Sequence, residues 1–197
     1  MRLTLVAGGT CTGTDCFVDA GSTFTLAVEV LETPTSYVLL QTFISYGVYD
    51  PSSNEDGAGP NTCDDGMDNG QRDGADRMDA DCVVLELTYL PSVSAADELF
   101  WTDLVPATAV RADAMGPGLL GHGGITGLIP PLPESSEIGV MTQIQMSCPA
   151  EATTVPISLL LYDDPLAKTS GSAFVRAGGG PKIIPRVSPI TLHCVVP

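Results

Sequence analysis

Apolar and polar residues alternate along the segment STFTLAVEVLE, and this alternation constrains the fold more than any other feature of the chain. In an extended chain, successive side chains point to opposite faces. One face therefore carries Phe24, Leu26, Val28 and Val30, and the other carries Thr23, Thr25, Ala27 and Glu29. A strand of this kind buries one face, so it must belong to a sheet that packs against a second layer.

Further short segments have the β-branched and aromatic composition of strands, and Gly, Pro, Ser or Asp bounds each of them. They are residues 37–49, 83–90, 138–148, 154–162, 172–175 and 188–196. Helical spacing is weak, and only residues 94–100 predict a helical turn. We therefore predict an all-β fold, a jelly-roll or immunoglobulin-like β-sandwich, formed by residues 1–197 as a single domain. The apolar run 119–133 is rich in Gly and Pro, so we expect it to cross one end of the sandwich as an ordered extended loop.

The charge of the chain limits the molecules that it can bind, and its cysteine content indicates the compartment in which it folds. The chain has 24 acidic and 8 basic residues and a formal net charge of -16, which disfavours nucleic acid as a partner. No segment reaches the roughly 20 apolar residues of a membrane span. The 6 cysteines form no CxxC pair, so we expect disulfides and an extracellular or cell-surface location.

The six cysteines allow fifteen sets of pairings, of which the sequence favours one pair firmly. That pair is Cys63 with Cys82, because these residues bracket one acidic segment. Cys148 and Cys194 each lie near the end of an expected strand, so a bridge between two strands is a second hypothesis. Cys11 and Cys16 are close enough in sequence to close a small loop with each other.

Residues 50–82 interrupt the strand pattern because they contain almost no apolar side chains, and we interpret them as an inserted acidic loop bracketed by a disulfide. Seven Asp residues lie between the two cysteines, with Arg72 and Arg77 as the only basic residues. So many carboxylates in a short loop repel one another unless a cation lies among them.

Calcium fits this loop because it takes six to eight oxygen ligands in a flexible geometry, which short Asp and Asn side chains on a glycine-containing loop can supply. Gly70 and Gly74 would allow the backbone to turn between ligands. The predicted ligands are Asp65, Asp68, Asn69, Asp73, Asp76, Asp79 and Asp81. The alternative is a solvated acidic loop that aids solubility and binds nothing.

Two resemblances follow from these residues. The stretch CDDGMDNGQRDGADRMDADC resembles the cysteine-bracketed Asp repeats of many secreted bacterial proteins, which are related to thrombospondin type 3 calcium repeats. The segment AGSTFTLAVEV followed by LLQTFISYG resembles the opening of cohesin-like domains, which are similar in fold to carbohydrate-binding modules. This second resemblance implies a jelly-roll β-sandwich used in cell-surface assembly, in some members by binding a dockerin partner.

Motifs for catalysis are weak. His122 and His193 have no nucleophile or second histidine near them in sequence, so we interpret both as structural. Several carboxylates are candidates for a glycosidase pair, namely Asp97, Glu98, Asp103, Asp163 and Asp164. The candidates for sugar stacking are Phe100, Trp101 and several Tyr residues. An enzyme is the least favoured reading, because acidic residues at strand ends are usually solvated.

Together these features predict a non-catalytic extracellular structural module that binds calcium. Its partners would be other protein subunits, further copies of this chain included, at a cell surface or in a polymer or filament. The alternative is a carbohydrate-binding or adhesion module of a secreted enzyme.

Overall fold

The computed structural model describes residues 1–33, 36–50, 53, 63, 82–92, 105–108, 118–127, 129–161, 171–176 and 182–197. These residues form strands and no α-helix. The strands are β1 (Arg2–Ala7), β2 (Thr10–Thr12), β3 (Asp15–Asp19), β4 (Thr23–Val30), β5 (Leu39–Ser45), β6 (Val48–Tyr49), β7 (Val83–Val84), β8 (Thr88–Leu90), β9 (Val105–Thr108), β10 (Leu119–Ile125), β11 (Gly139–Ser147), β12 (Thr153–Leu159), β13 (Ala173–Val175) and β14 (Ile190–Val195). Within the described part, no helix is long and apolar enough to cross a membrane.

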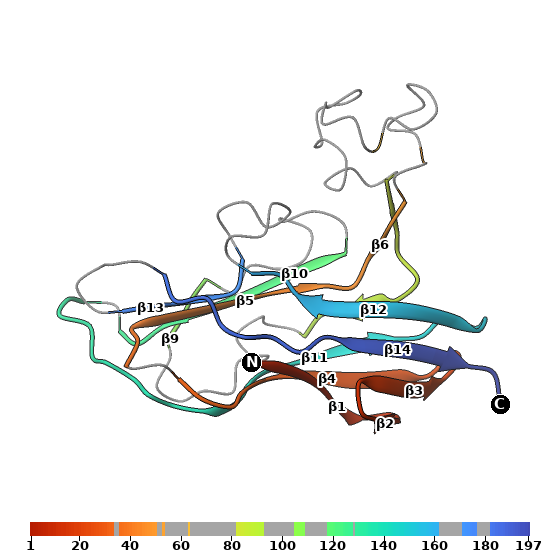
Figure 1. Ribbon diagram of the computed structural model, residues 1–197, viewed down its shortest axis with the longest axis horizontal. Helices are drawn as coiled ribbons and strands as arrows, with labels where there is room; N and C mark the ends of the chain where they lie inside the picture. The colour runs from red at the N-terminus through yellow and green to blue at the C-terminus, as the bar shows by residue number, and fades with distance from the viewer. Residues whose placement is uncertain are drawn as a thin grey trace.

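The strands form two main sheets that lie one over the other (Figure 1). The smaller sheet has four strands in the order β1-β4-β11-β8. The larger has eight, in the order β2-β3-β14-β12-β5-β10-β9, with β13 also paired to β5. All the strand pairs are antiparallel except β3 with β14, which run parallel. A separate short ribbon, β6 with β7, leads away from the sandwich.

Apolar side chains from both sheets form one core between them. The smaller sheet contributes the alternate residues of β4, among them Phe24 and Leu26, which are buried as the pattern predicts. The larger sheet contributes Ile157 from β12 and Leu192 from β14. At about 25 cal/mol per Å² of apolar surface, burial of these faces is the main force that holds the sheets together. The predicted all-β sandwich is therefore confirmed.

The expectation of an extended loop over residues 119–133 was wrong for its first half. Residues Leu119–Ile125 form β10, which pairs with β5 without a break from Leu119 opposite Ser45 to Ile125 opposite Leu39. Glycine has low strand propensity on its own, but main-chain hydrogen bonds to a neighbouring strand do not require side chains. Tertiary pairing therefore overrides the local composition.

Three N-terminal strands were also absent from the expectations. β1 extends the smaller sheet beside β4, while β2 and β3 join the larger sheet. The chain therefore passes from one sheet to the other between Ala7 and Thr10. Gly8 permits this passage, because its φ of 85° lies in the left-handed region and a Cβ there would meet the backbone of Thr23 and Phe24. The predicted helical turn at 94–100 lies outside the described residues.

Three disulfides join the cysteines: the pair that the sequence favours, Cys63 with Cys82, and the two pairs that it leaves as hypotheses. Cys148 follows β11 of the smaller sheet and bonds to Cys194 in β14 of the larger sheet, so this disulfide links the two layers. The bond between Cys11 and Cys16 joins β2 to β3 within one sheet. The third, between Cys63 and Cys82, is described below with the acidic insertion.

Two of the disulfides lie in the sandwich, and the one between the sheets should stabilise the fold more than the one within a sheet. The sequence separation is 46 residues for Cys148–Cys194 and 5 for Cys11–Cys16. The loss of chain entropy in the unfolded state then predicts that the first disulfide stabilises the fold by about 4 kcal/mol and the second by about 2 kcal/mol. We expect Cys148→Ala/Cys194→Ala to lower the free energy of unfolding in urea by more than Cys11→Ala/Cys16→Ala does. Equal losses would show that loop closure does not govern these bonds.

Candidate functional site

An aromatic and histidine pair stands on the outer face of the larger sheet. Phe17 of β3 lies directly opposite His193 of β14 in the parallel register. Their neighbours Cys16 and Cys194 are buried in the core. Because side chains alternate along a strand, burial of the two cysteines directs Phe17 and His193 outward.

Close contacts fix the histidine ring in place. The rings of Phe17 and His193 are stacked, with centroids 4.9 Å apart and planes 16° apart. The Nε2 atom of His193 lies 3.0 Å from Oδ1 of Asp15, and its Nδ1 atom lies 3.1 Å from Oγ1 of Thr154. Both ring nitrogens of His193 therefore have a partner. Phe17 is 40% exposed, so the face of its ring that does not contact His193 is open to solvent.

The array of Asp15, His193 and Thr154 contains the residue types of a nucleophilic triad, a hydroxyl beside an imidazole beside a carboxylate. Its setting differs from that of a catalytic triad, because these side chains lie on the outer face of three adjacent strands of the larger sheet. Asp15 is 53% exposed, so the charge is screened by water rather than concentrated in a cavity.

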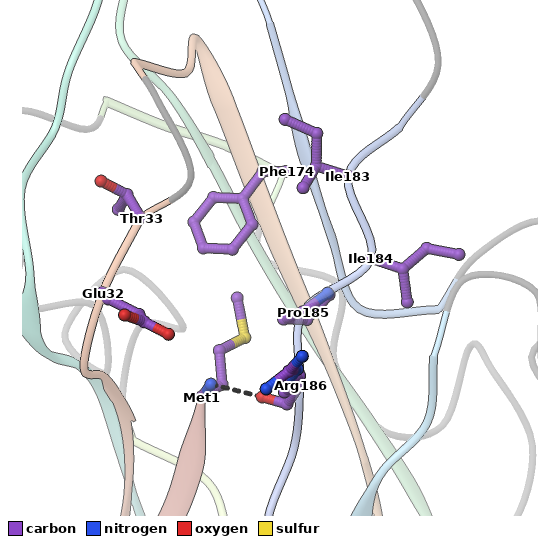
Figure 2. Close-up of a pocket in the computed structure, with 8 residues that line it drawn as sticks. All are labelled: Met1, Glu32, Thr33, Phe174, Ile183, Ile184, Pro185 and Arg186. Atoms are coloured by element: carbon purple, nitrogen blue, oxygen red, sulfur yellow. Dashed lines mark hydrogen bonds between the residues drawn. The ribbon is translucent and has the colours of Figure 1, made fainter.

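A half-open groove of about 420 Å³ lies at the N-terminal end of β1 (Figure 2). One wall is the chain just after β4, the other is the segment before β14, and Phe174 of β13 lies between them. The lining residues are Met1, Glu32, Thr33, Phe174, Ile183, Ile184, Pro185 and Arg186. The side chain of Met1 extends into the groove.

Charged groups also line the groove, at Met1, Glu32 and Arg186. The ammonium of Met1 donates a hydrogen bond to the carbonyl oxygen of Arg186 at 2.6 Å. Partial burial lowers the pKa of this ammonium, and the carboxylate of Glu32 opposes the change. The groove therefore combines apolar side chains, among them Phe174 and Ile183, with the charged residues Glu32 and Arg186.

The structure describes the base of the acidic insertion but not its carboxylates. The main-chain N–H of Asp50 donates to the carbonyl of Cys82 at 2.9 Å, and the hydroxyl of Tyr49 donates to the carbonyl of Cys63. These bonds, the ribbon of β6 and β7 and the disulfide between Cys63 and Cys82 close the two ends of the insertion together. The predicted calcium ligands, Asp65, Asp68, Asn69, Asp73, Asp76, Asp79 and Asp81, lie outside the described residues. Among the residues that are described, no group of three or more His, Cys, Asp or Glu side chains is placed to hold a metal.

His122 differs from His193 in its surroundings. It lies in β10 on the same face as the core residue Leu120, is 3% exposed, and stands opposite Thr42 of β5. The candidate glycosidase carboxylates and two of the aromatic residues proposed for sugar stacking lie outside the described part of the chain. They are Asp97, Glu98, Asp103, Asp163, Asp164, Phe100 and Trp101.

Phe17 and its neighbours were not among the predicted site residues. The pattern DCFVD does alternate, which is a local signal for a strand with Phe17 on the face opposite Cys16. Nothing local indicates that His193 pairs with Phe17, because 176 residues separate them and the contact depends on the parallel pairing of β3 with β14.

Comparison with known proteins gives a likeness in structure only. No family model matches the chain, and no curated protein sequence matches it. Among solved structures, a type II cohesin domain from the cellulosome of Acetivibrio cellulolyticus is 13% identical, with 97% of this chain and 92% of that chain covered and a TM-score of 0.45.

Two further matches are similar in kind. The sixth cohesin of scaffoldin B from Acetivibrio cellulolyticus, solved in complex with a dockerin, is 11% identical, with coverage of 98% and 96% and a TM-score of 0.45. A type I cohesin–dockerin complex from Clostridium thermocellum is 12% identical, with coverage of 99% and 100% and a TM-score of 0.40. At these identities and TM-scores, the likeness does not assign the chain to the cohesin family.

The contacts of His193 should matter little for stability. Exposed ion pairs contribute about 0 to 1 kcal/mol, because water screens them and side-chain entropy opposes them. We expect Asp15→Asn to lower the free energy of unfolding in urea by less than about 1 kcal/mol. Leu192→Ala, a change of a buried neighbour in the same strand, should lower it by about 2 to 5 kcal/mol. A loss from Asp15→Asn as large as that from Leu192→Ala would show that the array is part of the structural core.

Proposed function

We propose that this chain is a non-catalytic extracellular module that assembles with other protein subunits and binds calcium in the insertion at residues 50–82. The observation that carries the assembly part is the outward pair of Phe17 and His193, braced by Asp15 and Thr154. An exposed aromatic ring with little freedom to move is the type of side chain that contributes most at protein interfaces.

The strands that carry this pair are well suited to serve as a rigid platform. Cys16 adjoins Phe17 and is bonded to Cys11, and Cys194 adjoins His193 and is bonded to Cys148. A surface that is already ordered loses less side-chain and backbone entropy when a partner binds. The acidic character of the chain, with Asp15 and Asp19 on the same strand, favours a partner with basic side chains.

Calcium binding is supported by the chemistry of the predicted ligands and by the closed base of the insertion. Asp and Asn oxygens are the ligands that calcium prefers, and zinc would require His or thiolate ligands instead. The disulfide between Cys63 and Cys82 limits the separation of the two ends of the loop, with their Cα atoms 5.5 Å apart. This restraint reduces the entropy that the loop loses when it wraps a cation.

The carbohydrate-binding alternative receives no specific support from the described residues. A sugar-stacking platform needs several coplanar exposed aromatic rings. Among the described residues, Phe17 is the only exposed aromatic side chain, and its ring is stacked on that of His193. The alternative therefore stays a prediction from the sequence.

Calcium should raise the thermal stability of the oxidised protein. With an affinity of about 0.1 to 1 mM, 1 mM calcium stabilises the folded state by roughly 0.4 to 1.4 kcal/mol. We expect calorimetry to show a higher Tm with calcium than with EDTA, and no difference for Asp68→Asn/Asp73→Asn/Asp76→Asn. Asp15→Asn/Asp19→Asn is the matched control and should keep the calcium response. An equal response in the triple variant would place the cation elsewhere.

Assembly can be tested first with copies of the chain itself, by sedimentation velocity with and without millimolar calcium. We expect larger species with calcium, and their loss in Phe17→Ala, because truncating a central interface aromatic costs about 2 kcal/mol or more. Val6→Ala, a change of an exposed apolar residue of β1, should leave association unchanged. A monomer under both conditions would exclude self-association as the function.

A further inference from the structure

Three exposed side chains share the outer face of β3. Asp15, Phe17 and Asp19 are exposed, whereas Cys16 and Val18 between them are buried. Alternate residues of a strand lie roughly 7 Å apart on one face. A carboxylate therefore stands on each side of the ring of Phe17. We call Asp15, Phe17 and Asp19 the β3 cluster.

The β3 cluster has unused capacity to bind a cation. Oδ1 of Asp15 lies 3.0 Å from Nε2 of His193, which leaves Oδ2 as a further acceptor. The carboxylate of Asp19 has no hydrogen-bond or ion-pair partner within the described part of the chain. One face of the Phe17 ring is stacked on His193, and the other is open to solvent. A guanidinium fits this combination, because it is planar, stacks on aromatic rings and donates hydrogen bonds to carboxylates.

The basic side chains of the molecule are gathered elsewhere. The Lys and Arg residues that the structure describes are Arg2, Arg176, Lys182 and Arg186. The last three belong to one ribbon, in which Phe174 and Ile183 exchange two main-chain hydrogen bonds of 2.9 Å. This basic ribbon consists of residues 173–176, which include β13, and residues 182–186.

Arg176 is the most available arginine of the described chain. Arg2 forms an ion pair with Glu29 at 2.7 Å. Arg186 lines the groove together with Glu32 (Figure 2). Arg176 is exposed just after the end of β13, and among the described residues it has no ion-pair partner. Its guanidinium is therefore free to contact another molecule.

The β3 cluster and the basic ribbon lie towards opposite ends of the long axis of the sandwich, as the positions of β3 and β13 show (Figure 1). In the larger sheet, β14 and β12 separate β3 from β5, with which β13 pairs. The two complementary surfaces of one molecule therefore do not meet each other. Two different surfaces that fit each other join copies head to tail, which gives an open chain or a ring.

We propose that Arg176 of a second copy of this chain docks on the β3 cluster. Its guanidinium stacks on the open face of Phe17 and donates hydrogen bonds to the carboxylates of Asp15 and Asp19. This inference rests on the assembly function proposed above and names the partner. The support for a second copy is charge complementarity, because the chain itself carries both halves of the contact.

Repulsion between copies sets the conditions for a test. The formal net charge of -16 opposes contact between two molecules. The docked arginine offsets this repulsion locally, and calcium bound by the insertion would reduce it further. Association should therefore be measured by sedimentation velocity in millimolar calcium.

Single changes of the arginine test the contact. We expect Arg176→Gln to weaken association at least about tenfold, because it removes the charge that docks between two carboxylates. Arg186→Gln is the matched control, since Arg186 is another exposed arginine of the same ribbon, and it should assemble like the unchanged chain. A loss in Arg186→Gln without a loss in Arg176→Gln would overturn the choice of Arg176.

Arg176→Lys separates stacking from charge. Lysine keeps the positive charge but lacks the planar group that stacks on an aromatic ring and bonds to two carboxylates. We therefore expect Arg176→Lys to associate more weakly than the unchanged chain. Full association of this variant would overturn the stacking of the guanidinium on Phe17.

Mixing two variants tests the head-to-tail arrangement. Phe17→Ala lacks a working β3 cluster but keeps Arg176, and Arg176→Gln has the opposite defect. Each variant alone should remain a monomer, and an equimolar mixture should form dimers and nothing larger, because two such molecules share one intact contact. Both changes are of exposed residues, so the urea unfolding transition should be retained. A mixture that stays monomeric would overturn the arrangement.

The outcomes separate this inference from the function on which it rests. Association that is lost in Phe17→Ala but unchanged in Arg176→Gln would leave the proposed assembly face standing and overturn Arg176 as its partner. A monomeric unchanged chain in calcium would overturn the second copy as the occupant, and the assembly function would then require a different protein.

Discussion

Burial of one face of each sheet against the other is the constraint on which the rest of this structure depends. Leu26, Ile144, Ile157 and Leu192 come from strands of both sheets and are fully or almost fully buried. Once these side chains face inward, the alternation of the strands fixes what faces outward. The position of each exposed residue is therefore a consequence of core packing. A shift of one residue in the register of β14 would exchange His193 for its buried neighbours.

The connection between core and surface is clearest where the disulfides lie. Cys194 bonds to Cys148 across the two layers, and its neighbour His193 stands on the opposite face of the same strand. The same covalent bond that stabilises the sandwich also restrains the strand that presents the histidine. Because side chains alternate along a strand, the cysteine that points into the core and the histidine that points outward are neighbours. One bond in the core therefore both stabilises the fold and orders the outer face.

The groove at β1 has a different origin, because several elements form it rather than the face of one strand. One wall is the chain just after β4, the other is the segment before β14, and Phe174 of β13 lies between them. These segments are far apart in the sequence, so the order of the strands decides which side chains line the groove.

The sequence by itself determined the features that depend on local pattern: the strand β4 with its buried face, the all-β sandwich, the bracketing of the acidic insertion by Cys63 and Cys82, and the donor chemistry suited to calcium. Only the tertiary structure decided that the glycine-rich residues Leu119–Ile125 form a strand, because pairing with β5 supplies hydrogen bonds that local propensity does not encode. It also brought Phe17 to His193 and placed Phe174 between the two walls of the groove. The alternation of apolar and polar residues is visible within a few residues of sequence. Strand order instead brings together residues that are far apart in the chain, and the packing of the whole core sets that order.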